Sequence, residues 1–154
     1  MGPRLCSALI LLAGIGIGSL RDFLFINLNY QLDHVTRTTR TSFAHSRFQG
    51  WVEGWEAPGL IRLKWMLAGL FIISMWGLCL ALLKNRGMMH RLWRPVTMVF
   101  AGVAMAALAL HGLARWLPVE EASVNLLHAI QYPVLLLVLQ AALLLFPVAP
   151  KEQG

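Results

Sequence analysis

The feature that most constrains the fold is an uncharged run of 19 residues from Trp65 to Leu83, bracketed by Lys64 and Lys84. A helix over this run would be about 28 Å long, close to the roughly 30 Å thickness of the hydrocarbon core of a bilayer. The remainder is also apolar, since 58% of the 154 residues are hydrophobic and only 13% are charged. A soluble core of this size could not hide so much apolar surface, so the excess is expected to face lipid.

Three further apolar segments have the composition of membrane spans. The first begins at Leu5 and is expected to continue through Arg21–Asp22 as a retained helix, not a cleaved signal peptide, because apolar residues resume at once. The third begins at Pro95, which suits a first helical position, and the fourth contains Pro133, which should kink it. The sequence therefore predicts a single all-α integral membrane domain, an up-down bundle of four transmembrane helices with spans at about 5–28, 64–84, 95–117 and 122–147.

Small residues indicate where helices of the bundle could meet. Gly14 and Gly18 lie four positions apart in the first span, a spacing that permits close helix contact but also occurs in helices that face lipid. The third span is rich in alanine and glycine between Ala101 and Ala109, which favours tight packing inside the bundle.

The region between the first two spans, about residues 29–62, has no apolar run long enough to cross a membrane. Its apolar and aromatic side chains fall near one helical face, and they are Phe43, Phe48, Trp51, Val52 and Trp55. This pattern predicts an amphipathic surface helix with its tryptophans at headgroup depth. Gly50 and Gly54 should limit its length.

Basic residues set the expected orientation. The connector from Lys84 to Arg94 carries four arginine or lysine residues and no acid, so it should be cytoplasmic. Both termini would then lie on the cytoplasmic side of the bacterial inner membrane, and the 29–62 loop and the turn at 118–122 would face outward. A basic cytoplasmic rim also accounts for the net charge of +6, and the sequence shows no arginine-rich soluble segment of the kind that binds nucleic acid.

Polar residues in or near the membrane are the candidates for a functional site, because they are costly there and often functional. A first helix continued through residues 21–34 would present polar faces on the outward side, together with polar residues of the loop and of the third and fourth spans. These residues predict an outward-facing polar cap that binds a partner or only orders the loop: Arg21, Asp22, Asn27, Asn29, Asp33, His34, His45, Arg47, His111, Arg115 and His128.

His111 and His128 flank the turn at Pro118 and are expected at similar depth in an antiparallel hairpin. Two facing histidines are the axial ligands of a b-type haem, which makes haem b an alternative cofactor. Polar packing, or a substrate or proton site, would explain the same residues. The sequence has no GxSxG, HExxH or GxxxxGK[ST] motif, so an enzyme of those classes is not indicated. Asp33, His34 and His45 are too scattered to predict a metal site.

Three stretches carry a resemblance to a known family: LRDFLFINLNYQLDH, FAHSRFQ and LIRLKW. Together they resemble a family of small four-helix membrane proteins of bacteria of the Bacteroidetes type, over most of the chain. Some small membrane proteins of this size in those bacteria are accessory to exosortase systems, which process sorting-tagged exported proteins. The cysteine, arginine and histidine arrangement of an exosortase active site is missing, and Cys6 lies at the start of the first helix. The resemblance therefore implies a partner and not the transpeptidase.

The sequence favours a non-enzymatic membrane accessory or scaffold protein that acts in envelope assembly or protein export and sorting. It would bind a membrane or exported protein partner through the outward cap. One alternative is a haem- or ligand-binding redox protein that uses His111 and His128. The other is a small transporter or channel subunit, which with four short spans and few intramembrane charges would require a homo-oligomer.

Overall fold

A computed structural model describes residues 2–37, 49–114 and 116–145. Within these ranges the helices are α1 (Pro3–Arg37), α2 (Gln49–Val52), α3 (Ala57–Asn85), α4 (Met89–Leu113), α5 (Glu120–Gln131) and α6 (Val134–Leu145). Three of them, α1, α3 and α4, are long and apolar enough to cross a membrane, and the bent pair of α5 and α6 would add a fourth span if counted as one. The predicted all-helical class is confirmed.

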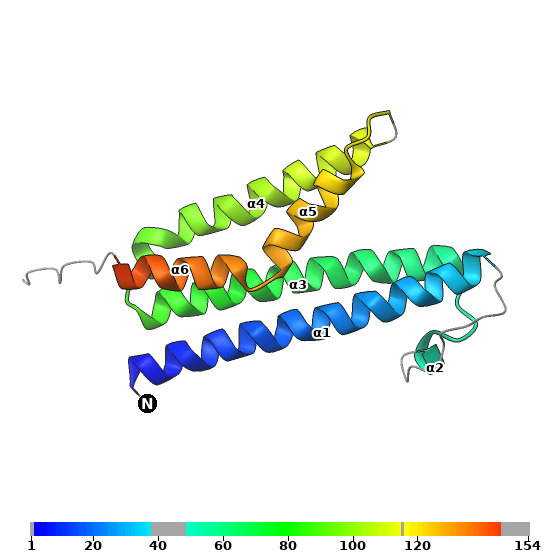
Figure 1. Cartoon of the computed structure of the whole chain (residues 1–154). Coiled ribbons are helices and arrows are strands. Elements are labelled where there is room, and N and C mark those ends of the chain that lie inside the picture. The colour runs from blue at the N-terminus through cyan, green and yellow to red at the C-terminus, as the bar shows by residue number, and fades with distance from the viewer. Residues whose placement is uncertain (1, 38–48, 115, 146–154) are drawn as a thin grey trace, which may run out of the picture.

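Successive long helices run in alternating directions (Figure 1). The side-chain amide of Asn85, at the end of α3, donates to the carbonyl of Pro3 at 2.8 Å and to the hydroxyl of Ser7 at 2.9 Å, which holds α1 antiparallel to α3. The indole N–H of Trp76 donates to the hydroxyl of Thr97 at 3.0 Å and joins α3 to α4. The start of α1, the α3–α4 turn and the end of α6 therefore lie at the same end of the bundle (Figure 1).

The turn between α3 and α4 is shorter than the sequence indicated. The N–H groups of Gly87 and Met88 donate back to carbonyls in the last turn of α3 at 3.1 and 2.9 Å, which forms a Schellman motif. Gly87 has a φ of 70°, which glycine adopts without steric cost. Because this motif reverses the chain within three residues, α4 already begins at Met89. The prediction that Pro95 is at the first position of a helix is wrong, since Pro95 lies inside α4.

The first helix continues beyond the predicted span of 5–28, as its expected extension through residues 21–34 requires, and ends at Arg37. Its 35 residues correspond to about 52 Å. No glycine or proline occurs between residues 19 and 37 to end the helix earlier. The extension packs against Leu60 of α3 through an apolar stripe at helical spacing, made of Leu24, Leu28, Leu32 and Val35.

Much of the predicted surface helix lies outside the described residues, because residues 38–48 are not among them. The described part is α2, a single turn whose Val52 is buried against α1 and α3. Gly54, with a φ of 78°, then turns the chain, so that Trp55 follows the turn and does not continue the helix. The helix of the third segment ends at Leu113, before the predicted boundary at 117, but with 25 residues it is not shorter than the predicted span.

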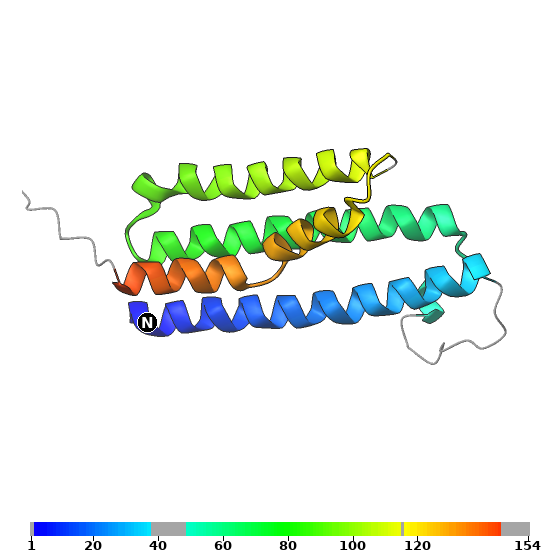
Figure 2. The same cartoon turned by 45° about the horizontal axis from the view of Figure 1, so that its top comes forward.

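The fourth segment is broken at its middle. The axis of α6 is bent by 53° from that of α5, and Tyr132 between them is extended, with a ψ of 159°. Pro133 causes the break because it has no N–H for a helical hydrogen bond and disfavours a helical residue before it. The predicted kink is confirmed, but the expected single helix is two. The hydroxyl of Ser123 donates to the carbonyl of Ala107 at 2.8 Å and holds α5 on α4, whereas α6 leaves α4 and lies along α1 and α3 (Figures 1 and 2).

Candidate functional site

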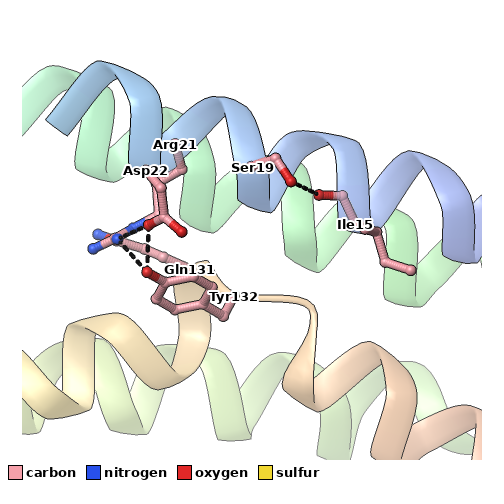
Figure 3. A network of polar contacts seen from close by, with 6 residues as sticks. All are labelled: Ile15, Ser19, Arg21, Asp22, Gln131 and Tyr132. Carbon is pink, nitrogen blue, oxygen red and sulfur yellow. Dashed lines mark hydrogen bonds and ion pairs between the residues drawn. The ribbon is translucent and has the colours of Figure 1, made fainter. Parts of the chain in front are cut away.

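Arg21 lies at the centre of a buried polar cluster (Figure 3). Only 3% of its surface is exposed, although it belongs to a long apolar helix. Its Nε donates to Oε1 of Gln131 at 2.8 Å, and its Nη1 donates to the Tyr132 hydroxyl at 3.0 Å and to Oδ1 of Asp22 at 2.9 Å. The Tyr132 hydroxyl also donates to the same Asp22 oxygen. These four residues, Arg21, Asp22, Gln131 and Tyr132, are hereafter the Arg21 cluster.

The break at Pro133 explains how two residues of the fourth segment reach α1. Gln131 is the last residue of α5, and the extended backbone of Tyr132 turns its ring toward the guanidinium of Arg21. The guanidinium carbon lies 4.6 Å from the centroid of the Tyr132 ring and 4.7 Å from that of Phe25, so cation–π attraction adds to the hydrogen bonds. A cation beside the carboxyl end of α5 also has a favourable interaction with the helix dipole.

Gly14 and Gly18 allow the break to approach α1 closely. A Cβ atom at Gly18 would lie 3.0 Å from Cδ of Pro133, and one at Gly14 would lie 2.6 Å from Cδ2 of Leu136. A side chain at Gly18 would push the Pro133 ring away from α1, and one at Gly14 would force the Leu136 side chain to move. The close helix contact that the spacing of this pair permits is therefore present. Gly16, between them in sequence, is exposed, and a Cβ there would meet nothing within 4 Å.

The Arg21 cluster lies within the apolar length of α3 and not beyond its end. Asn29, two turns after Arg21 on α1, accepts a hydrogen bond from Nζ of Lys64 at 3.0 Å, and Lys64 immediately precedes the uncharged run of α3. Arg21 lies eight residues before Asn29, which places it about 12 Å farther into that run. The ring contact between Phe25 and Phe71, with centroids 6.2 Å apart, agrees with this register. The structure therefore places Arg21 in the interior of the bundle, with Asp22 half-exposed beside it, at a level within the uncharged run of α3.

The remaining predicted cap residues are dispersed. His128 lies at the edge of the Arg21 cluster, with its ring 6.0 Å from that of Tyr132 in an edge-to-face arrangement. Asn27 donates to a carbonyl of its own helix at 2.7 Å. Asp33 is not free, since it interacts with another residue. Nδ1 of His34 is buried and forms no hydrogen bond with any of the described residues. Three others lie outside the described residues, and they are His45, Arg47 and Arg115.

His111 and His128 are not brought together. The hydrogen bond from Ser123 to Ala107 fixes the antiparallel register of α5 on α4, and continuing this register places His128 opposite Gly102. His111 lies nine residues farther along α4, a separation of about 13 Å. Its exposed ring instead meets a tryptophan ring of α3, with centroids 5.1 Å apart. In the described part of the chain, no group of three or more histidine, cysteine or acidic side chains is arranged to hold a metal ion.

Gln131 and Tyr132 belong to the site but were not among the predicted site residues. One signal was present, because Gln131 is a polar residue within an apolar segment and directly precedes a Tyr-Pro pair. A polar side chain beside a helix break in a membrane segment requires a partner. The identity of that partner could not be predicted, since Arg21 and Gln131 are 110 positions apart. No protein-family model, curated protein or solved structure matches the chain, so its function has to be inferred from the physical chemistry of this cluster.

Proposed function

We propose that the protein is a non-enzymatic scaffold or accessory subunit of the bacterial inner membrane that docks a transmembrane helix of a partner protein against α1. Large apolar side chains face outward along the bundle, as lipid contact requires; for example, Leu12, Ile73 and Met98 are 62, 63 and 70% exposed. The end that carries the α3–α4 turn is basic, which favours a cytoplasmic position for that end and for both termini.

The observation that carries the proposal is the half-exposed carboxylate of Asp22. Its side chain is 43% exposed, whereas that of Arg21 is 4% exposed. Both Arg21 and Tyr132 bond to Oδ1 of Asp22, and the other carboxylate oxygen contacts none of the residues drawn in Figure 3. A carboxylate that faced lipid at this depth would be costly. A polar group on a partner helix would form a hydrogen bond with this second oxygen. Because a helix without such a group would leave the carboxylate exposed to lipid, the hydrogen bond would make the docking specific.

The surface of α1 around Asp22 suits a helix partner. Gly16, Ser19, Phe23 and Ile26 are exposed and follow one another at intervals of three and four residues, so they form one stripe with Asp22 beside it. The small side chains at Gly16 and Ser19 permit close approach of a second backbone. Phe23 and Ile26, 52 and 51% exposed, provide apolar contact on the other side of the carboxylate. Because the sequence resembles small four-helix membrane proteins of the Bacteroidetes type, we propose a partner that acts in envelope assembly or protein sorting.

Site-specific photocrosslinking in membranes tests this interface. A photoreactive residue at Ser19 should crosslink a membrane protein, and both Gly16→Leu and Asp22→Asn should reduce its yield several-fold. Gly16→Leu blocks the close approach, and Asp22→Asn removes the charge while keeping an oxygen for Arg21 and Tyr132. Gly102→Leu is the matched control, because Gly102 is also exposed and open but lies on α4. Equal crosslinking yields in all variants would contradict the proposal. A crosslink only to a second copy of the chain would show that the partner is the chain itself.

The broken helix beside Asp22 favours a second candidate, a small proton transporter or channel subunit. Helices that are discontinuous near the middle of the membrane commonly form transporter sites. The carboxyl group of Asp22 and the hydroxyl of Tyr132 share a hydrogen bond and can both exchange protons. Proteoliposomes with an internal pH dye and a potassium diffusion potential should then acidify several-fold faster with the wild-type chain than with Asp22→Asn. Rates equal to those of empty liposomes would exclude this candidate.

A further inference from the structure

A narrow apolar groove of about 260 Å³ lies between α4 and α6, with Cys79 of α3 at its base. It exists because the break at Pro133 turns α6 away from α4 after α5 has packed against that helix. In Figure 1, α5 leaves the side of α4 along its length, and α6 continues beside α3. The groove is distinct from the Arg21 cluster and from the exposed stripe of α1.

The lining of the groove follows α4 and α6 for about two turns each. On α4 its lining extends from Leu92 to Phe100, and on α6 it extends from Leu135 to Ala142. These stretches correspond to about 12 and 10 Å along the two helix axes. The volume is slightly below the range of roughly 300–1,000 Å³ that is usual for pockets of small molecules. An apolar groove of this shape, parallel to membrane-spanning helices, fits a hydrocarbon chain better than a compact ligand.

One end of the groove reaches a concentration of positive charge. Arg91, which is exposed, directly precedes Leu92 at that end of the lining and lies one turn before Pro95, another lining residue. The neighbouring α3–α4 turn contributes Arg86, whose Nε is buried and bonds to none of the described residues. In the described ranges the acidic residues lie away from this end, and they are Asp22, Asp33, Glu53, Glu56, Glu120 and Glu121. An anionic group at the mouth would therefore meet several cations, and no carboxylate of the described residues lies beside it.

We propose that this groove binds an anionic phospholipid, with one acyl chain along α4 and α6 and the phosphate at the arginines of the α3–α4 turn and the start of α4. The apolar lining accounts for the chain, and the charge at the mouth accounts for the anionic headgroup. Arg91 and Arg86 can both donate to phosphate oxygens. The first N–H groups of α4, whose N-cap residue Met88 makes no side-chain cap hydrogen bond, add a weaker attraction for an anion.

Native mass spectrometry of the full chain tests the proposal. The chain is reconstituted in nanodiscs that contain equal amounts of phosphatidylglycerol and phosphatidylcholine, and the lipids retained after release into mild detergent are counted. The wild-type chain should retain phosphatidylglycerol in preference to phosphatidylcholine. Arg91→Gln should reduce this preference about fivefold, since one basic residue near a membrane surface contributes about 1 kcal/mol. Arg62→Gln, an exposed arginine at the far end of the bundle, should leave it unchanged.

Filling the groove provides a second, independent variant. Ala142→Trp places a large ring in the lining of α6 and should abolish lipid retention. Ala141→Trp is the matched control, because Ala141 is exposed on the same helix and does not line the groove. Equal retention of the two lipids, or equal retention by the two tryptophan variants, would overturn the proposal. So would a stable dimer that only Ala142→Trp dissociates, since the groove would then hold a second copy of the chain.

Discussion

Arg21→Met should lower the free energy of unfolding by about 3 kcal/mol. Removing one partner of a buried ion pair typically costs about 3–5 kcal/mol, because the remaining charge is left without compensation. In this chain the variant leaves the carboxylate of Asp22 without its cation and the side-chain oxygen of Gln131 without its donor. The lower end of the range is expected, because the carboxylate of Asp22 is 43% exposed and is therefore not fully buried.

Titration of the purified chain from mild detergent into SDS, followed by circular dichroism, measures this change. Arg62→Met is the control, since Arg62 is exposed and should shift the free energy of unfolding by no more than about 0.5 kcal/mol. The double variant Arg21→Met, Asp22→Asn should recover part of the loss, because it removes both charges together. If Arg21→Met unfolds at the same point as Arg62→Met, the Arg21 cluster does not stabilise the bundle.

The features that the sequence predicted correctly are those with local causes. The absence of charge between Trp65 and Leu83 is enough to predict a long apolar helix, and α3 extends over all of it. Pro133 is enough to predict a bend, because it removes a helical hydrogen bond wherever it occurs inside a helix. The prediction was wrong where two local signals, Gly87 and Pro95, competed. The Schellman motif at Gly87 ends the connector, so α4 begins six residues before Pro95.

The depth of Arg21 and Asp22 could not be predicted from local hydropathy. A pair of charges in an apolar sequence suggests a membrane boundary, since an isolated charge is costly in lipid. The bundle buries Arg21 because Gln131 and Tyr132 supply acceptors and an aromatic face from a segment more than 100 positions away. Likewise, hydropathy does not show that Gly14 and Gly18 lie in a helix contact whereas Gly16 lies on an open surface. The difference arises only from the position of α6.

From this difference we predict that two leucine substitutions on α1 change the free energy of unfolding in opposite directions. Gly18→Leu should destabilise the bundle by about 1–3 kcal/mol, because its Cβ alone would lie 3.0 Å from the rigid ring of Pro133. Gly16→Leu should stabilise the isolated chain by somewhat less than 1 kcal/mol, since leucine has the higher helix propensity and the site is open. The same SDS titration measures both, and equal effects would show that α6 does not pack closely on α1.

Gly18→Leu and Arg21→Met should also be non-additive. A side chain at Gly18 displaces Pro133 from α1, and Gln131 and Tyr132 move with it because they are adjacent in the chain. Once those two residues have left the guanidinium, Arg21 contributes less, so its removal should cost at least 0.5 kcal/mol less in the Gly18→Leu background than in the wild type. In the Gly16→Leu background the cost of Arg21→Met should remain unchanged. Additivity in both backgrounds would mean that the Arg21 cluster and the glycine contact stabilise the broken helix independently.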